Sequence, residues 1–296
     1  MSGPSELLAA VIENRQPLEP IETNIDAQLP KISGIRAVIF DVYGTLVVSG
    51  SGDVGSANDG DKASKIGEAF AAVGWYPPVL DIPQYASLLQ SEIKRSNDPR
   101  RNENCPKPEV DIVDVWRNVL VAAGLDSLAT DSTQCVRFAA EYESRANPTW
   151  PMPGASELLG VLRDRKIPLG IVSNAQIFTI PLVEDLTGGD LAETGFDLNL
   201  SVFSNRFRQA KPGPRLFQVL CDGLRRLDIA PHEAIYVGND MLNDVWAARQ
   251  AGLRTAWFAG DRRSCRRRDD DPRCQSLRPD IVLTDLLQLP DCLSID

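Results

Sequence analysis

The segment Ala37-Val38-Ile39-Phe40-Asp41-Val42-Tyr43-Gly44-Thr45-Leu46 decides how this chain is interpreted. Four apolar residues run into an aspartate, and Gly-Thr and further apolar residues come soon after it. This pattern is typical of a buried strand that carries a carboxylate to its C-terminal end, the edge where open α/β sheets bind ligands. A carboxylate at that place is suited to act as a nucleophile, as a metal ligand, or as both.

Composition narrows the classes of partner. The chain has 296 residues, 43% hydrophobic and 24% charged, which is ordinary for a soluble globular protein. Its net charge of −10 and its pI near 4.8 argue against nucleic acid or an anionic membrane as partner, because the protein's field repels phosphate. No apolar run reaches the ~20 residues of a membrane helix, and no secretory signal is visible. Six scattered cysteines without a C-x-x-C pair suggest reduced thiols and a cytoplasmic location.

Strand-like and helix-like segments alternate over much of the chain. This alternation predicts an α/β fold with a doubly wound, Rossmann-like parallel sheet. The strand-like runs are 37–40, 169–172, 198–203, 234–237, 255–258 and 281–283, and the helix-like segments between them are 155–165, 214–227 and 242–251.

The alternation fails between residues 48 and 150. That interval opens with a Gly/Ser loop, 49–56, contains only helix-like segments, and closes with a Pro-rich hinge, 147–154. We therefore predict a helical cap, 48–150, inserted into a core formed by 35–47 and 151–296. The helices are expected near 62–73, 82–96, 110–123 and 132–145. Residues 1–34 are expected to form an N-terminal extension that packs on the surface, with a short helix over 5–14.

Four short motifs each follow a strand-like run. The motifs contain Asp41, then Ser173, then Lys211, and finally Asp240 with Asp244. Each one taken alone has a purely structural explanation that requires no function. These explanations are, in the same order, a tight turn, a helix N-cap, an exposed lysine and a capped helix start. Asp240 and Asp244 are four residues apart and would share one face of a first helical turn, where carboxylates are also suited to bind Mg²⁺. The charged run 262–271 is expected to be a solvated loop whose basic and acidic halves compensate each other.

Taken together and in this order, the motifs resemble those of the haloacid-dehalogenase-like hydrolase superfamily, in particular members with a helical cap after the first motif. The resemblance spans roughly residues 35–290. It implies that Asp41 is the nucleophile, oriented by Thr45. It also implies a substrate site at Ser173 and Asn174, with Lys211 neutralising the substrate's charge. Mg²⁺ would be held by Asp41, the backbone carbonyl of Tyr43, Asp240 and Asp244, the last directly or through water.

Tyr43 departs from the pattern of most phosphatases of this type, which carry an aspartate there as general acid and base. Such help is worth roughly 10²–10⁴-fold, and a tyrosine with its ordinary pKa near 10 is a poor substitute. The first motif instead resembles that of the 2-haloacid dehalogenases, in which the leaving halide needs no proton. The cap is another source of a proton donor, and the candidates are its polar residues Glu92, Lys94, Glu109 and Asp111.

The fourth motif favours the opposite choice, because Asp240 is an extra carboxylate beside the nucleophile and calls for a cation. We therefore expect a Mg²⁺-dependent hydrolase that acts on a small phosphorylated metabolite through an aspartyl-phosphate intermediate. The first alternative is a metal-independent dehalogenase acting on a small halogenated acid. The second is a non-catalytic binding protein of the same fold. The motifs specify neither the substrate nor the oligomeric state.

Overall fold

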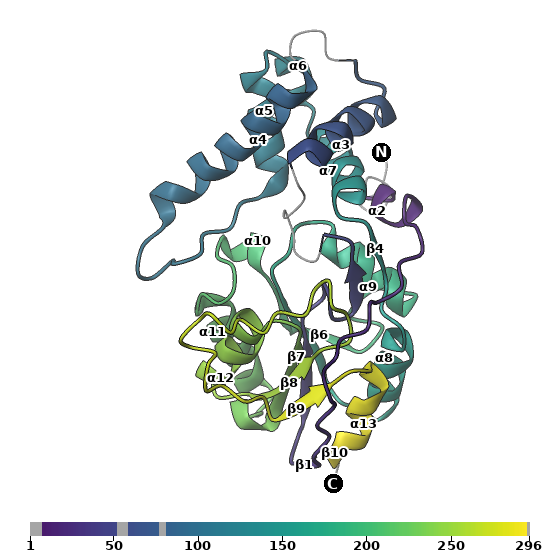
Figure 1. Cartoon of the computed structure of the whole chain (residues 1–296), viewed down its shortest axis with the longest axis vertical. Helices are drawn as coiled ribbons and strands as arrows, with labels where there is room; N and C mark the ends of the chain where they lie inside the picture. The colour runs from purple at the N-terminus through teal and green to yellow at the C-terminus, as the bar shows by residue number, and fades with distance from the viewer. Residues whose placement is uncertain (1–7, 52–58, 77–80, 295–296) are drawn as a thin grey trace.

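A six-stranded parallel sheet forms the centre of the protein (Figure 1). The computed structural model describes residues 8–51, 59–76 and 81–294. The sheet has the order β6-β5-β2-β7-β8-β9, and every neighbouring pair is parallel. The strands are β2 (Ala37–Phe40), β5 (Leu169–Ser173), β6 (Phe196–Phe203), β7 (Ala234–Gly238), β8 (Arg254–Phe258) and β9 (Ile281–Leu283).

Helices cover both faces of this sheet, and the strand sequences show why. Successive side chains of a strand point to opposite faces, and all four residues of β2 are buried. Val38 and Phe40 belong to the apolar cluster that includes α8 (Ala155–Asp164), α9 (Thr179–Thr187) and α13 (Leu289–Cys292). Ala37 and Ile39 join the opposite cluster, with α11 (Arg215–Arg226) and α12 (Ala247–Gln250). The predicted α/β class and doubly wound sheet are confirmed.

The chain order places a crevice beside β2. From β2 the chain proceeds outward to β5 and β6, then returns to β7 on the other side of β2 and continues to β8 and β9. Open α/β sheets bind ligands at the carboxyl end of the strands where this reversal occurs. Asp41 follows β2 directly, and the segment from Asn239 to Asp244 follows β7, so the two meet at the reversal point.

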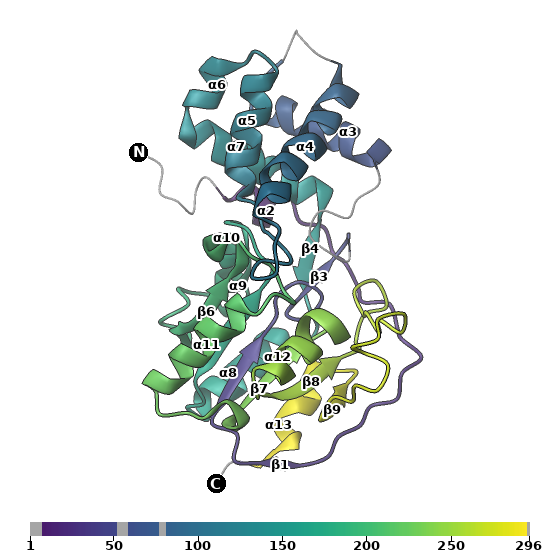
Figure 2. The same ribbon diagram turned by 90° about the vertical axis from the view of Figure 1, so that its left-hand side faces the viewer.

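The segment between β3 and β4 is helical and lies beyond one end of the sheet (Figure 2). Its interior is aromatic, with ring contacts that link Phe70, Trp116 and Phe138. The helices are α3 (Asp59–Ala72), α4 (Ile82–Asn97), α5 (Ile112–Ala122), α6 (Asp126–Thr130) and α7 (Ser132–Ala146), with a short 3-10 turn, η1 (Asp98–Arg100), after α4. The sequence pattern did not indicate α6 or, in the core, α9.

Two strands join this helical segment to the sheet domain, which corrects the expectation of helices alone between 48 and 150. β3 (Val47–Ser49) pairs antiparallel with β4 (Thr149–Pro151), so part of the Pro-rich hinge is a strand. Proline is tolerated there because a two-stranded ribbon has free edges. Residues 52–56 of the expected Gly/Ser loop lie outside the described residues.

The N-terminal segment packs along the sheet domain. α2 (Ala10–Glu13) buries Ala10 and Val11, and β1 (Ile32–Ser33) pairs in parallel with β10 (Leu293–Ser294) near the other end of the chain. The first residues of the helix expected over 5–14 lie outside the described part. The remaining short elements are α10 (Ser204–Phe207), the 3-10 turns η2 (Pro231–Glu233) and η4 (Leu286–Gln288), and the π-helical η3 (Met241–Trp246).

Within the described ranges no helix has the length and apolar character needed to cross a bilayer. All six cysteines are free thiols.

Two glycines provide a matched test of the packing. A Cβ on Gly170 in β5 would come within 2.6 Å of the Leu200 carbonyl oxygen and 2.7 Å of Ile39 Cδ1, whereas a Cβ on Gly160 in α8 would meet nothing within 4 Å. We expect Gly170→Ala to lower the free energy of unfolding by about 1–3 kcal/mol. Gly160→Ala should raise it by about 0.5–1 kcal/mol, because alanine favours helix. Urea denaturation measures both, and equal effects would contradict this account of the sheet.

Candidate active site

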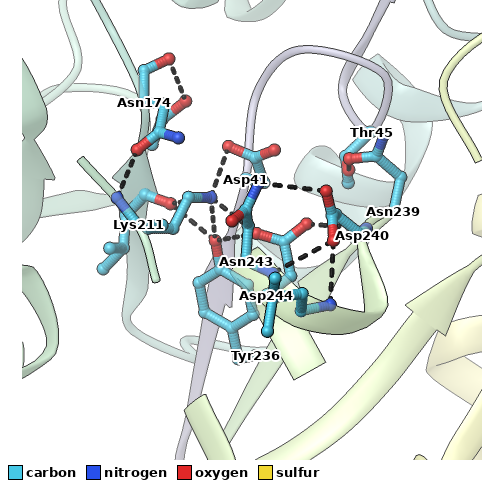
Figure 3. A network of polar contacts seen from close by, with 12 residues as sticks. Asp41, Thr45, Asn174, Lys211, Tyr236, Asn239, Asp240, Asn243 and Asp244 are labelled. Carbon is cyan, nitrogen blue, oxygen red and sulfur yellow. Dashed lines mark hydrogen bonds and ion pairs between the residues drawn. The ribbon is translucent and has the colours of Figure 1, made fainter. Parts of the chain in front are cut away.

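Motif residues from four separate segments meet at the reversal point of the sheet (Figure 3). They enclose a small cavity of about 30 Å³. Its lining combines three carboxylates with amide, hydroxyl and basic groups: Asp41, Tyr43, Asn174, Lys211, Asn239, Asp240, Asn243, Asp244, Ser264 and Arg266. Sequence positions from 41 to 266 therefore share one polar chamber at the carboxyl edge of the sheet.

Lys211 lies at the centre of this chamber. Its Nζ is 3.0 Å from Asp41 Oδ1 and 2.6 Å from Asp244 Oδ1, and it also contacts the Tyr236 hydroxyl at 2.8 Å and the Val172 carbonyl at 3.0 Å. The lysine is 1% exposed, so these oxygens replace the water that an ammonium would otherwise bind. Figure 3 shows the ammonium between the end of β2 and the turn after β7.

The charges of this cluster shift each other's protonation equilibria. Burial lowers the pKa of Lys211, but the carboxylates of Asp244 and Asp41 act against it, and the net pKa is raised. Burial raises the pKa of Asp244, the Lys211 ammonium opposes that rise, and the nearby Asp41 and Asp240 add to it. Lys211 therefore stays charged and compensates two carboxylates at once.

Hydrogen bonds with Asn174 and with the loop before α5 hold the backbone around Lys211 in place. Asn174 Oδ1 accepts a hydrogen bond from Lys211 N at 2.7 Å. One residue earlier, Ala210 N donates to the Lys107 carbonyl at 2.8 Å, and Glu109 N donates to the Arg208 carbonyl at 3.0 Å. The loop before α5 thus lies directly against the segment that carries the lysine.

Asp240 begins the turn after β7. Its Oδ1 accepts hydrogen bonds from Leu242 N at 2.8 Å and Asn243 N at 3.0 Å, which makes it the N-cap of the π-helical η3. The predicted helical start is thus present, although its first turns are π-helical, a geometry often found at functional sites. The Arg268 guanidinium also binds the Asp240 carboxylate, with Nη2 at 2.5 Å from Oδ2. The expectation of a merely solvated 262–271 loop is wrong, because this loop reaches the chamber.

The oxygen atoms of the chamber are potential ligands for Mg²⁺. This ion prefers oxygen ligands and is often held by one or two carboxylates together with water and substrate. No group of three or more His, Cys, Asp or Glu side chains forms a ready metal cluster among the described residues. However, Asp41 and Asp240 line the same cavity, and Asn243 Oδ1 is buried there without a hydrogen-bond partner. An oxygen-only set with one unpartnered buried acceptor fits Mg²⁺.

The other predicted site residues lie close by but in different roles. Thr45 is fully buried, and its Oγ1 is 3.4 Å from Asn239 Oδ1. Ser173 is also fully buried, and its hydroxyl contacts the Asn174 carbonyl at 3.3 Å. Neither side chain lines the cavity, whereas Asn174 and Lys211 do.

Tyr43 lines the cavity without being poised for proton transfer. Its hydroxyl shares a hydrogen bond of 3.1 Å with Thr179. Burial, the negative charge of Glu143 and that of Asp41 raise its pKa, against the opposing effect of the Thr179 bond. The phenol therefore stays protonated, and its hydroxyl is hydrogen-bonded to Thr179.

Three of the four candidate proton donors in the helical segment are engaged elsewhere. Arg95 and Asn118 bind the Glu92 carboxylate at 2.7 Å, and Asp111 caps α5 by accepting from Val113 N at 3.0 Å. Glu109 accepts a hydrogen bond of 3.0 Å from the Ser204 hydroxyl. Among the residues that the structure describes, none of these, nor Lys94, lines the cavity.

Several site residues were missed from the sequence. Tyr236 was read only as part of a buried strand, although a hydroxyl in such a strand must find a partner. Its hydroxyl donates to the Val172 carbonyl at 2.6 Å and receives a bond from Lys211. Asn239 belongs to the fourth motif, beside Asp240, but has no predicted role there. No pattern indicates Asn243, Ser264 or Arg266.

Comparison with known proteins identifies the family. Residues 35–252 match the family model of haloacid dehalogenase-like hydrolases, and the chain belongs to this family of enzymes. It is 27% identical over 228 residues to a phosphoglycolate phosphatase of Escherichia coli K12, covering 75% of this chain and 80% of that protein. It is 31% identical over 178 residues to a phosphoserine phosphatase of Thermus thermophilus, covering 59% of this chain and 62% of that one.

Solved structures support the fold. A 2-haloacid dehalogenase from Pseudomonas syringae pv. tomato DC3000 superimposes with a TM-score of 0.54 at 19% identity, covering 87% of this chain and 97% of that one. A defluorinating L-2-haloacid dehalogenase gives a TM-score of 0.51 at 20% identity, covering 87% and 94%. At this identity the likeness establishes the shared architecture.

The Tyr236 hydroxyl offers a test of the lysine cluster. Tyr236→Phe keeps the ring but removes one of the four oxygens around Lys211 Nζ. We expect a loss of about 1–2 kcal/mol in the free energy of unfolding. Tyr76→Phe, at a tyrosine that is 81% exposed, should change it by less than about 0.5 kcal/mol. Equal unfolding free energies for the two variants in denaturant titrations would refute a structural role for the hydroxyl.

Glu143 in α7 predicts a pH dependence of stability. Burial raises its pKa from 4.5 to about 7, despite a hydrogen bond from Asn147 at 3.3 Å. Between these values the unfolded chain loses this proton and the folded protein keeps it, so stability falls as pH rises, by at most about 1.4 kcal/mol per pH unit. Glu143→Gln should remove this decline between about pH 4.5 and 7 in unfolding curves. The exposed Glu157→Gln should follow the wild type, and a similar curve for Glu143→Gln would disprove the shift.

Proposed function

We propose that this hydrolase cleaves the phosphate monoester of a small metabolite with the help of Mg²⁺. One observation carries the proposal: Asp41 and Asp240 line the same small cavity as the unpartnered Oδ1 of Asn243. Removing halide from carbon requires a nucleophile but no second carboxylate, whereas Asp41 and Asp240 together offer a divalent cation two carboxylate ligands. The similarity to phosphoglycolate and phosphoserine phosphatases agrees with this choice.

In the proposed reaction Asp41 attacks the phosphorus atom. A bond forms between a carboxylate oxygen and phosphorus, and the bond between phosphorus and the ester oxygen breaks, with its electron pair leaving on that oxygen. Water then attacks the aspartyl phosphate, which releases inorganic phosphate and restores the Asp41 carboxylate. Lys211 remains beside Asp41 and neutralises the charge gathered there.

The same residues suggest where a metal would bind. Asp41, Asp240 and the backbone carbonyl of Tyr43 are the proposed ligands, with Asn243 Oδ1 as a further oxygen and Asp244 acting through its bond to Asp240 N, at 2.9 Å. When bound, Mg²⁺ supplies positive charge that reduces the repulsion between the phosphate and Asp41.

The missing proton donor constrains the substrate. Tyr43 keeps its proton, and its hydroxyl is hydrogen-bonded to Thr179. Substrates whose leaving oxygen is only weakly basic should therefore react faster than simple alkyl phosphates. The proposed substrate class is a small phosphorylated compound with such a leaving group, and residues 48–150 are proposed to form the cap that selects it.

A metal-independent 2-haloacid dehalogenase is the second candidate. The observation that favours it is Tyr43, together with the Arg268 guanidinium that compensates Asp240 without a metal. Halide would leave carbon as Asp41 attacks, with no proton required.

Parallel assays of nitrophenol release from p-nitrophenyl phosphate and halide release from 2-chloropropionate separate the candidates, each with Mg²⁺ and with EDTA. The nitrophenolate group leaves without a proton donor, so Tyr43 does not prevent the reaction. We expect Mg²⁺-dependent nitrophenol release and no halide. Asp41→Asn should reduce turnover at least about 10³-fold, since it removes the nucleophile. Halide release in the presence of EDTA would overturn the phosphatase proposal, and a wild-type rate for Asp41→Asn would overturn the nucleophile.

A further inference from the structure

The loop between β8 and β9 is anchored to the turn that carries Asp240. Asn239 Nδ2 donates to the Ser264 carbonyl at 2.6 Å. Arg266 N donates to the Asn239 carbonyl at 3.0 Å, and Met241 N donates to the Arg266 carbonyl at 2.8 Å. These backbone bonds align the loop with both sides of Asp240, which fixes where the next residues of the loop begin.

Two residues further along, Arg268 turns back onto Asp240. Its φ is 56°, a left-handed conformation that is uncommon outside glycine and needs support from its surroundings. Its Nε lies 3.1 Å from each oxygen of the Asp240 carboxylate, and its Nη2 lies 2.5 Å from Oδ2. Asp240 is almost fully buried, whereas the arginine side chain is 34% exposed.

The contact between Arg268 and Asp240 is one of the ion pairs between cations and carboxylates in the chamber. Lys211 forms ion pairs with Asp41 and with Asp244. Asp240 forms its ion pair with Arg268 instead. Each of the three carboxylates thus has a cationic side chain beside it, and Arg268 donates to both oxygens of the carboxylate that is proposed to bind Mg²⁺.

We propose that Arg268 is the resident counter-cation of Asp240 and that Mg²⁺ competes with it for this carboxylate. The inference rests on the proposed metal site. Asp240 Oδ1 already accepts hydrogen bonds from two backbone N–H groups, and Oδ2 accepts from Asn243 Nδ2 as well as from Arg268. Since each carboxylate oxygen has about two lone pairs, the guanidinium must withdraw, at least in part, before an Asp240 oxygen can bind a metal. Withdrawal involves rotation of a long, partly exposed side chain, while the backbone of Arg266 keeps its bonds to the turn.

Isothermal titration calorimetry on the full chain measures the Mg²⁺ affinity, which the competition with Arg268 should lower. Arg268→Ala should bind Mg²⁺ roughly ten- to a hundredfold more tightly than the wild type, since charge-assisted hydrogen bonds no longer oppose the metal. Arg268→Lys, which keeps the charge but not the forked donor, should fall between them. Arg267→Ala is the matched control, because it removes the neighbouring charge, which pairs with Asp269, and should leave the affinity unchanged.

A second readout follows the melting temperature without and with Mg²⁺. In EDTA, Arg268→Ala should melt below the wild type, because Asp240 has lost its cation, and Mg²⁺ should raise its melting temperature by more than it raises that of Arg267→Ala. Equal Mg²⁺ affinities for the wild type and Arg268→Ala, or weaker binding by the variant, would overturn the competition and leave the metal site standing. Absence of Mg²⁺ binding in every variant would overturn both this inference and the proposed metal dependence. The phosphatase reaction is judged separately by nitrophenol release.

Discussion

The pairing of one buried lysine with two buried carboxylates is the constraint on which the site depends. Lys211 arrives on a loop after β6, Asp41 ends β2, and Asp244 lies in the turn after β7. Removing one member of such a group leaves an uncompensated charge in a poorly solvated place, which costs far more than a surface ion pair. The same contacts that hold Asp41 therefore also tie together three parts of the core that are distant in sequence.

The chamber is equipped to hold negative charge and poorly equipped to deliver a proton. Lys211 and Arg268 both face carboxylates, and backbone N–H groups complete the coordination of Asp240. By contrast, the phenol of Tyr43 bonds to Thr179 and its pKa is raised. Chemistry in which charge stabilisation dominates suits such a site better than chemistry limited by protonation of a leaving group.

The sequence predicted those features that depend on a local pattern of residue types. Alternating apolar strands and helices predicted the sheet, and the motif residues Asp41, Asn174, Lys211, Asp240 and Asp244 do line a common cavity. The sequence pattern did not predict helix α9, although Pro181 lies in its first turn, where proline is compatible with a helix. The contact between Arg268 and Asp240 could not be predicted, because it depends on the path of a loop 28 residues downstream rather than on local pattern.

The antiparallel ribbon of β3 and β4 means that the chain enters and leaves the helical segment at neighbouring points, with Gly50 N bonded to the Pro148 carbonyl at 2.8 Å. The residues between β3 and β4 are therefore attached to the sheet domain like one large loop whose two ends are held together by hydrogen bonds. Inserts whose ends are close together are well tolerated. The helical segment can thus change in length and sequence during evolution while the strands that carry Asp41 and Asp240 keep their register.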